Sequence, residues 1–296
     1  NYSGGTTISA GTLEGNSTSL HGNIINNATL NFNQTSDGTF SGVMSGTGSL
    51  TKLGNGKLIL TGANSYSGGT TISSGTLEGN TSSLQGDIVN NSMLNFNQVT
   101  NGTFSGGISG TGTVTKLGAG KLTLSGNSSF STAININQGS ISILSNLINS
   151  NFTVNNGGTL SGTGTVRDII NDGVIAPGNS IGTLNIVGDY TNNSGSLEIE
   201  IDNLGNSDRL NITNNANING GSVNIIPIPG NYGANTYTFI TTGGLVNGSF
   251  SNVNFLSAIN LSPSVVYNPN SVQLVISQQV ANNINALLEI YTPNYA

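Results

Sequence analysis

Residues 45–79 read SGTGSLTKLGNGKLILTGANSYSGGTTISSGTLEG, and parts of this stretch recur upstream and downstream at one fixed offset. With a shift of 64 residues, positions 1–64 align with positions 65–128 without a gap, and 43 of those 64 positions are identical. In a solenoid, each repeat buries its apolar face only by stacking on its neighbours. This internal duplication therefore predicts a solenoid.

Within the 64-residue module, apolar residues between short polar turns indicate a shorter pitch. Six of them are separated by 22, 20, 22, 22 and 20 positions: Ile8, Leu30, Leu50, Ile72, Leu94 and Val114. Three coils of about 21 residues then fit one module. Segments such as KLILTG and GTLEG are short, apolar at alternate positions and bounded by Gly, Asn and Ser, as strands are. The pattern predicts an all-β fold, a parallel β-helix.

The composition agrees with a long, narrow core. Of 296 residues 43 are glycine, 6% are charged and 34% are hydrophobic, which fits neither a helical bundle nor a charged disordered tail. We expect one continuous elongated domain. The strand register predicts eight inward-facing residues: Leu50, Leu58, Leu60, Ile72, Leu77, Val114, Leu122 and Leu124.

Charge and cysteine content exclude several functions. The formal charge of -6 comes from 12 acids and 6 bases, and four of the bases are repeat equivalents: Lys52, Lys57, Lys116 and Lys121. Without a basic patch, nucleic acid is not expected as a partner. The absence of cysteine excludes disulfides and thiolate metal sites. No apolar run approaches the roughly 18 residues that span a bilayer.

The repeat fades after residue 126, and a different segment follows. The stretch APGNSIGTL at 176–184 contains Pro177, which fixes φ, and Gly178, which permits a left-handed turn, so we expect a corner between strands there. The next segment, GSLEIEIDN, alternates strictly between apolar and acidic residues. Five aromatic residues then concentrate bulk where a β-helix is capped: Tyr232, Tyr237, Phe239, Phe250 and Phe255.

The combination of GSLTKLGNGKLILTGANSYSGGTTISSGTLEG with the later APGNSIGTLNIVGDYT resembles the passenger domains of bacterial autotransporters, which use type V secretion. It matches their passenger-associated repeat followed by a C-terminal, autochaperone-like folding segment. The resemblance implies a right-handed β-helix displayed on or released from a Gram-negative cell surface. It also implies a C-terminal outer-membrane barrel as the partner that anchors the full-length protein, so we expect this chain to be a fragment.

These features divide the chain into three parts. We expect β-helix repeats in 1–167, a C-terminal β-helix cap or autochaperone-like segment in 168–277, and a helix and linker towards the barrel in 278–296. An apolar helical stripe ends before Pro293 and supports the helix: Val280, Ile284, Leu287 and Leu288. In the family, such a helix leads into the barrel pore. The alternative is a helix that caps the β-helix.

Candidate chemistry is weak throughout the chain. Glycines 46, 48, 54 and 56 do not form a phosphate loop, because Leu58 follows Lys57 where Ser or Thr is required. The lone His21 is replaced by Gln85 in its duplicate, which argues against a catalytic histidine. Glu14 and Glu78 occupy the same site one module apart, as expected of a decorated turn.

The densest charge group consists of Glu198, Glu200, Asp202, Asp208 and Arg209. It allows a calcium site, but a solvated strand face with a local ion pair fits better. We therefore predict no catalytic, cofactor-binding or metal-binding residues and no cofactor.

The sequence thus predicts a non-enzymatic, structural β-helical stalk that assists its own secretion and folding. It would be part of a surface adhesin or virulence factor that meets a host-cell receptor or glycan. The alternative is a β-helical polysaccharide lyase or hydrolase, a class that shares the fold. We further expect folding to start in residues 168–277, where the largest apolar side chains lie.

Overall fold

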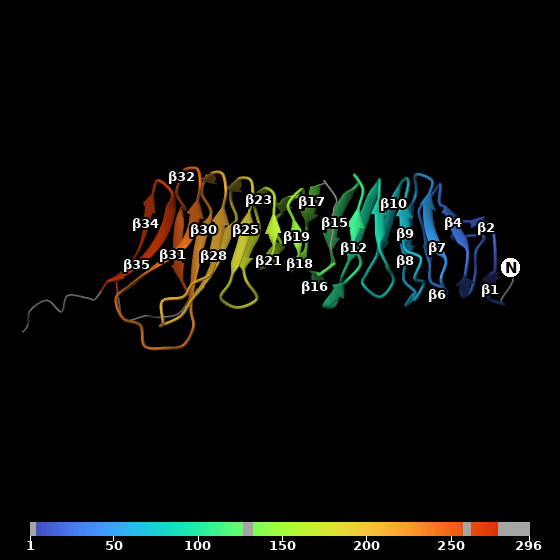
Figure 1. The fold of residues 1–296 in the computed structure, drawn as a ribbon, viewed down its shortest axis with the longest axis horizontal. Helices are drawn as coiled ribbons and strands as arrows, with labels where there is room; N and C mark the ends of the chain where they lie inside the picture. The colour runs from blue at the N-terminus through green and yellow to red at the C-terminus, as the bar shows by residue number, and fades with distance from the viewer. Residues whose placement is uncertain (1–3, 127–132, 257–261, 278–296) are drawn as a thin grey trace, which may run out of the picture.

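The computed structural model describes residues 4–126, 133–256 and 262–277, and these residues form strands and turns without any helix. The strands wind into an elongated rod along which the chain runs in order from one end to the other (Figure 1). The predicted all-β parallel β-helix is confirmed. The helix expected in 278–296 lies outside the described residues.

Three sheets begin in the first module, and all their strand pairs are parallel. The 3-stranded sheet contains β1 (Thr6–Ile8), β3 (Ile24–Asn26) and β6 (Met44–Ser45). The 6-stranded sheet contains β2 (Thr12–Gly15), β4 (Thr29–Asn33), β7 (Ser49–Leu53), β9 (Thr70–Ile72), β11 (Ile88–Asn90) and β14 (Ile108–Ser109). The 11-stranded sheet contains β5 (Gly38–Phe40), β8 (Lys57–Leu60), β10 (Thr76–Gly79), β12 (Met93–Asn97), β15 (Thr113–Leu117), β17 (Ala133–Ile136), β20 (Asn151–Val154), β23 (Ile169–Asn171), β26 (Tyr190–Asn192), β29 (Ala216–Ile218) and β32 (Val246–Gly248).

Two further sheets begin later in the chain and continue to the C-terminal end of the rod. The 8-stranded sheet contains β13 (Gly102–Phe104), β16 (Lys121–Leu124), β18 (Gly139–Ile143), β21 (Gly158–Gly162), β24 (Val174–Pro177), β27 (Ser196–Ile201), β30 (Ser222–Pro227) and β33 (Asn252–Phe255). The 7-stranded sheet contains β19 (Asn146–Leu147), β22 (Thr165–Val166), β25 (Thr183–Ile186), β28 (Arg209–Ile212), β31 (Asn235–Thr242), β35 (Ser271–Ser277) and β34 (Ser262–Asn268).

The coil in the duplicated modules is shorter than the sequence predicted. Leu13, Leu30, Leu50 and Thr70 pair in successive coils of the 6-stranded sheet, at separations of 17, 20 and 20 residues. The expected 21-residue coil is therefore wrong for this region. Later coils are longer because their loops are longer: Tyr190 pairs with a residue 26 positions ahead, Ala216.

The expectation failed because some inward positions are polar. Ile8 pairs with Asn26, and Ile72 pairs with Lys52 on one side and Asn90 on the other. The side chains of all three polar residues are buried. A series of apolar residues spaced about 21 positions apart therefore mixes residues from different faces of the solenoid.

One 64-residue module is consequently three coils plus the step to the next face. Strand β2 belongs to the 6-stranded sheet, whereas its module equivalent β10 belongs to the 11-stranded sheet. Likewise β5 lies in the 11-stranded sheet and its equivalent β13 in the 8-stranded sheet. Identical sequence therefore builds successive faces of the rod, which shows that strand and turn geometry is encoded locally.

The core lies along the axis of the rod and consists of the alternate, inward-facing residues of each strand. All eight residues predicted to face inward are at most 3% exposed. The same alternation buries Leu197, Ile199 and Ile201 on β27. Edge-to-face packing within a coil joins Phe32 to Phe40, and Phe96 to Phe104 in the second module, at centroid distances of 5.1 and 5.2 Å.

Tight turns bring neighbouring coils into backbone contact at certain glycines. Gly46 and its module equivalent Gly110 have φ of +99° and +100°, a region that side chains other than glycine rarely adopt. A Cβ atom on Gly110 would overlap the carbonyl oxygen of Asn90 in the neighbouring coil. The turn glycines in the SGTG stretches thus have a structural role.

The C-terminal end of the 7-stranded sheet changes from parallel to antiparallel pairing. Strand β31 pairs in parallel with β28 and antiparallel with β35, which in turn pairs antiparallel with β34. The hairpin therefore covers the edge of β31 at the end of the rod (Figure 1). Phe239 and Tyr237 on β31 are buried, and the Tyr237 hydroxyl donates a hydrogen bond of 2.7 Å to the carbonyl of Asp202.

Candidate functional site

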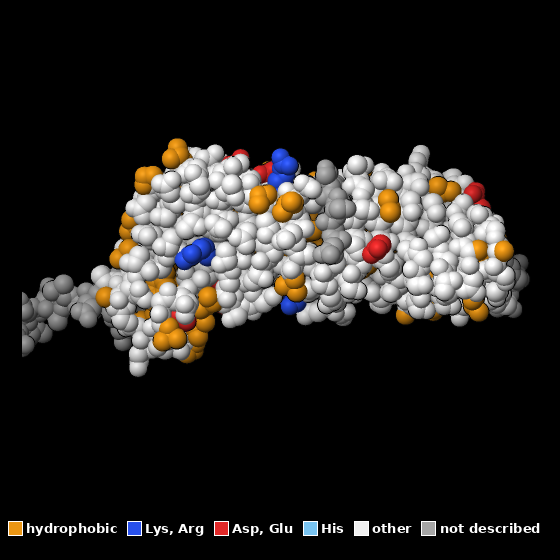
Figure 2. Space-filling model, in the orientation of Figure 1, with side chains coloured by type: hydrophobic (Ala, Val, Ile, Leu, Met, Phe, Trp, Pro, Cys, Tyr) orange, Lys and Arg blue, Asp and Glu red, His pale blue; other side chains and the backbone are white. Residues whose placement is uncertain are grey.

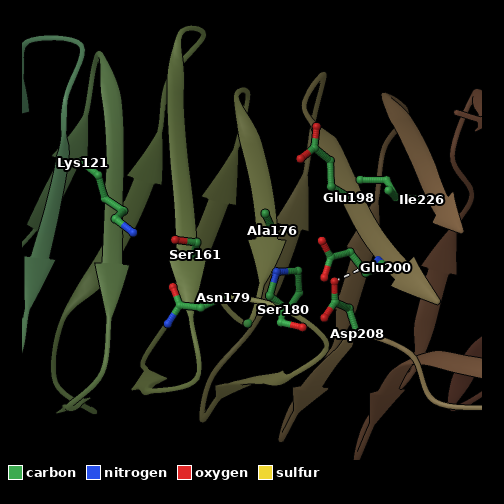
Figure 3. Close-up of a pocket in the computed structure, with 11 residues that line it drawn as sticks. Lys121, Ser161, Ala176, Asn179, Ser180, Glu198, Glu200, Asp208 and Ile226 are labelled. Atoms are coloured by element: carbon green, nitrogen blue, oxygen red, sulfur yellow. Dashed lines mark hydrogen bonds between the residues drawn. The ribbon is translucent and has the colours of Figure 1, made fainter. Parts of the chain in front are cut away.

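A groove on the outer face of the 8-stranded sheet is the strongest candidate site. Its cavity volume is about 200 Å³, and it lies where the APGNSIG turn folds over β21 and β24 (Figure 3). Lys121 lies at one end, and Glu198 and Glu200 lie at the other. The surface of the rod is otherwise dominated by uncharged polar groups on the face that Figure 2 shows, with charged side chains scattered over it.

Small outward-facing residues make room for the turn. Ser161 and Ala176 form part of the groove lining, and the hydroxyl of Ser142 donates a 3.1 Å hydrogen bond to Oδ1 of Asn179 in the turn. The backbones of Gly162 and Gly178 exchange two hydrogen bonds of 2.9 Å. Gly178 has φ of +87°, so the left-handed corner predicted from the Pro-Gly pair is confirmed.

Asp208 connects this turn to the next two strands of the rod. Its Oδ1 accepts a 2.8 Å hydrogen bond from the N–H of Gly182, and its Oδ2 accepts a 2.9 Å bond from the N–H of Glu200. Its own N–H donates to the carbonyl of Glu200 at 2.8 Å. Asp208 is only 2% exposed, and both of its carboxylate oxygens accept hydrogen bonds from backbone N–H groups. Its side chain therefore stabilises the turn and is not available to bind a ligand.

Burial raises the pKa of Asp208 to about 7, and the negative charge of Glu200 adds to this effect, whereas the two backbone N–H donors oppose it. The pKa of Glu198 is also raised, first by burial and then by the charge of Glu200. The pKa of Asp202 is lowered, chiefly by the hydrogen bond from the Asn206 side chain. Neighbouring acids thus have different environments.

The sequence placed five charged residues in one group, and the structure separates them. Glu198, Glu200 and the buried Asp208 line the groove. Asp202 instead closes a turn by accepting hydrogen bonds from the N–H groups of Leu204 and Asn206. Arg209 lies on the 7-stranded sheet, where its Nε donates to the carbonyl of Thr238.

The expected local ion pair in this group is wrong. The ion pairs in the described part of the chain are Lys57–Glu78 and Arg167–Asp168, at 3.7 and 3.5 Å. Arg209 cannot pair with Asp208 because alternation along β28 directs it outwards while Asp208 is buried. The described residues also contain no cluster of three or more His, Asp or Glu side chains that could hold a metal ion.

Glu14 and Glu78 make the same contacts on different faces. Glu14 accepts hydrogen bonds from the side chains of Asn31 and Asn33, and Glu78 accepts them from Asn95 and Asn97. Each glutamate therefore bonds to the strand of the next coil. His21 lies in a turn that lines a small hollow with Thr39 and Phe40.

Sequence reasoning missed two buried lysines. Lys52 and Lys116 are fully buried, and burial lowers the pKa of each to about 8. Strand alternation contains the signal, because Lys52 lies two positions after the inward-facing Leu50. The burial of Asp208 was also missed, since it depends on the APGNSIG turn folding over the sheet.

The titration of Asp208 predicts a pH dependence of stability. Its pKa is raised on folding, so its protonated form is favoured in the folded chain, and stability is lost as the pH rises from about 4 through 7. We expect the free energy of unfolding to fall over this range by about 2 to 4 kcal/mol at most.

Denaturant unfolding of the wild type and of Asp208→Asn at several pH values between 4 and 8 measures this effect. The amide resembles the protonated acid, so the variant should lose most of the slope and retain the smaller part that comes from Glu198. If the free energy of unfolding depends on pH in the same way for both proteins, Asp208 does not titrate in this range.

The chain contains segments that are typical of a known protein family. A family model described as the passenger-associated-transport-repeat matches residues 1–14, 50–78 and 114–143. These segments include both buried lysines. The described residues include no helix that could cross a membrane.

Curated relatives resemble larger parts of the chain. An extracellular serine protease of Serratia marcescens is 38% identical over 164 residues, which cover 51% of this chain and 16% of the protease. The adhesin BmaC autotransporter of Brucella suis biovar 1 (strain 1330) is 32% identical over 241 residues, which cover 70% of this chain and 7% of the adhesin. The chain thus spans only a small part of the relatives that it matches.

Proposed function

The chain belongs to the autotransporter passengers that carry passenger-associated transport repeats, and we propose that it serves them as a rigid structural stalk. The observation that carries this proposal is the uninterrupted stacking of strands in the 11-stranded sheet, which continues from the first module to the C-terminal coils. Stacked coils resist bending because each is hydrogen-bonded to both neighbours. The stalk holds whatever precedes it at a fixed distance from the cell surface.

The chain is part of a secreted or surface-displayed protein, as its relatives are. We further propose that the full-length protein is anchored in the outer membrane by its own C-terminal barrel. The upstream region of the passenger would then meet a host receptor or glycan as part of an adhesin or virulence factor. Similarity to the named adhesin supports this reading.

The proposed stalk is not an enzyme. The matched segments cover only 16% of each serine protease. The protease name therefore describes the whole relatives and does not assign protease activity to the matched segments. The single histidine of the chain, His21, is replaced by Gln85 in the second module. Both carboxylate oxygens of Asp208, the buried acid of the groove, accept hydrogen bonds from backbone N–H groups. No feature of the described residues favours a polysaccharide lyase or hydrolase.

We assign the autochaperone-like role to residues 168–277. This part contains the APGNSIG turn, the hydrogen bonds by which Asp208 joins that turn to Glu200 on β27, and the antiparallel hairpin β34–β35. The paired hairpin and the buried aromatic residues make it a self-contained end on which further coils can stack.

Surface display tests the proposal. The chain is placed between a secretion signal with an epitope tag and an outer-membrane barrel, and antibody binding to intact cells is measured. Deletion of 65–128 removes one exact module and should leave display intact, whereas deletion of 168–277 should abolish it or leave a protease-sensitive passenger. Equal display by both deletions would contradict the folding role. Cleavage of acidic glycans or peptides by the purified chain would contradict the non-enzymatic role.

A further inference from the structure

The two buried lysines have nearly identical surroundings. The Nζ of Lys52 donates hydrogen bonds to the carbonyl oxygens of Leu53 and Gly54 in its own coil, at 2.8 and 2.7 Å. It also donates to the carbonyl of Ser74, at 3.2 Å. Ser74 follows β9, which pairs with the lysine's own strand β7. The ammonium therefore joins two neighbouring coils.

Lys116 repeats this arrangement and extends it to a third coil. Its Nζ donates to Leu117 and Gly118 at 2.8 and 2.6 Å, and to Gln138 at 3.1 Å. A longer contact of 3.5 Å reaches the carbonyl of Gln98. Gln98 and Gln138 follow β12 and β17, the two strands that flank the lysine's own strand β15.

Local sequence is sufficient to build this arrangement. Lys52 lies in the 6-stranded sheet and Lys116 in the 11-stranded sheet, so the two copies occupy different faces of the rod. In both, the acceptors are one, two and 22 positions after the lysine. The residue that follows the third acceptor is a glycine in the left-handed region, Gly75 or Gly139, with φ of +68° or +67°.

The acceptors are backbone dipoles and not carboxylates. Neither lysine is in an ion pair of the described residues. Burial lowers the pKa of Lys52, whereas the negative charge of Asp37 raises it. A pKa of about 8 leaves both side chains protonated at neutral pH. Rings of carbonyl oxygens are the ligands that replace the hydration shell of a monovalent cation in ion-selective sites.

We propose that the turn within each TKLGxG stretch, together with the turn that stacks on it in the next coil, is a cation-binding site for a primary ammonium, which the chain fills with its own lysine. This internal ligand fixes the register between neighbouring coils, because the carbonyls converge on one point only when the coils are correctly stacked. The site is independent of what the passenger binds at the cell surface.

Chemical rescue of Lys116→Ala tests the proposal. The substitution leaves a space that matches n-propylammonium, the missing part of the side chain. We expect the melting temperature of this variant to fall by about 4 °C or more, and to recover when propylammonium chloride is added at millimolar to molar concentrations. Sodium chloride and 1-propanol should not restore it. The exposed Lys121→Ala is the matched control and should respond to none of the additives.

Equal recovery with 1-propanol, no recovery with propylammonium, or the same response in the control would overturn the proposal. Lys116→Met covers the case in which the alanine variant does not fold, because it keeps the apolar stem and removes only the ammonium. We expect the melting temperature of Lys116→Met to lie below that of Lys121→Met. Failure of Lys116→Met to fold would support the proposal, because it is the largest loss of stability that the substitution can cause. A methionine variant at least as stable as the wild type would show that the carbonyls need no cation.

Discussion

Replacing Phe239 with alanine should lower the free energy of unfolding of the C-terminal part by about 3 to 5 kcal/mol. Phe239 lies on β31, is fully buried and occupies the strand at which parallel pairing gives way to the antiparallel hairpin. The substitution removes apolar contacts and leaves a cavity in the last closed part of the core. It should therefore weaken the attachment of β35 and β34 to the rod.

Denaturant unfolding monitored by circular dichroism measures this loss. The control is Leu245→Ala, because Leu245 is 54% exposed at the same end of the rod and its truncation should cost little. A loss below about 1 kcal/mol for Phe239→Ala would mean that the aromatic residue does not support the cap.

Limited proteolysis should leave a resistant fragment from residues 168–277. Strands here are longer than in the modules: β31 has 8 residues, and β34 and β35 have 7 each. Several of the largest fully buried side chains, including Tyr190, Tyr237 and Phe239, also lie here. In a solenoid, coils with larger buried interfaces open last, so this end should be the most stable.

A protease of broad specificity is needed, because the chain contains only 6 Lys and Arg residues. Mass spectrometry of the surviving fragment identifies its ends. The Phe239→Ala protein is the matched control and should lose the resistant fragment first. A surviving fragment from residues 1–126 would contradict a C-terminal folding nucleus.

The sequence predicted the fold because its strongest signals are local. Alternation along KLIL and SLEIEI places residues such as Leu58 and Ile199 inside regardless of how the coils stack. The Pro-Gly pair at 177–178 likewise specified its corner, since φ is restricted for the first residue and permissive for the second.

The coil length was mispredicted because buried polar residues interrupt the apolar columns. Asn26 is buried because its side-chain amide donates to the carbonyl of Ser49 and its Oδ1 accepts from the N–H of Ala28. Lys52 is buried because backbone carbonyls surround its ammonium. A pattern of apolar residues cannot show such positions, because the hydrogen bonds that make burial tolerable depend on the folded backbone and come in part from neighbouring coils.

The sequence did not predict the candidate groove, for a similar reason. The alternating acids Glu198 and Glu200 were placed on the outer face correctly, but the contact of Asp208 with Gly182 joins residues 26 positions apart. Only the three-dimensional fold brings the APGNSIG turn over the sheet. The expectation that these acids bind no metal tightly stays a prediction.

The length of the rod after insertion of one module tests the central claim most directly. Duplicating residues 65–128 adds three coils and one face, which at about 4.8 Å per coil is about 16 Å. Small-angle X-ray scattering of the purified chain, with and without the extra module, should show a maximum dimension longer by this amount and an unchanged cross-section. A wider cross-section with no increase in length would contradict a stalk built from stacked coils.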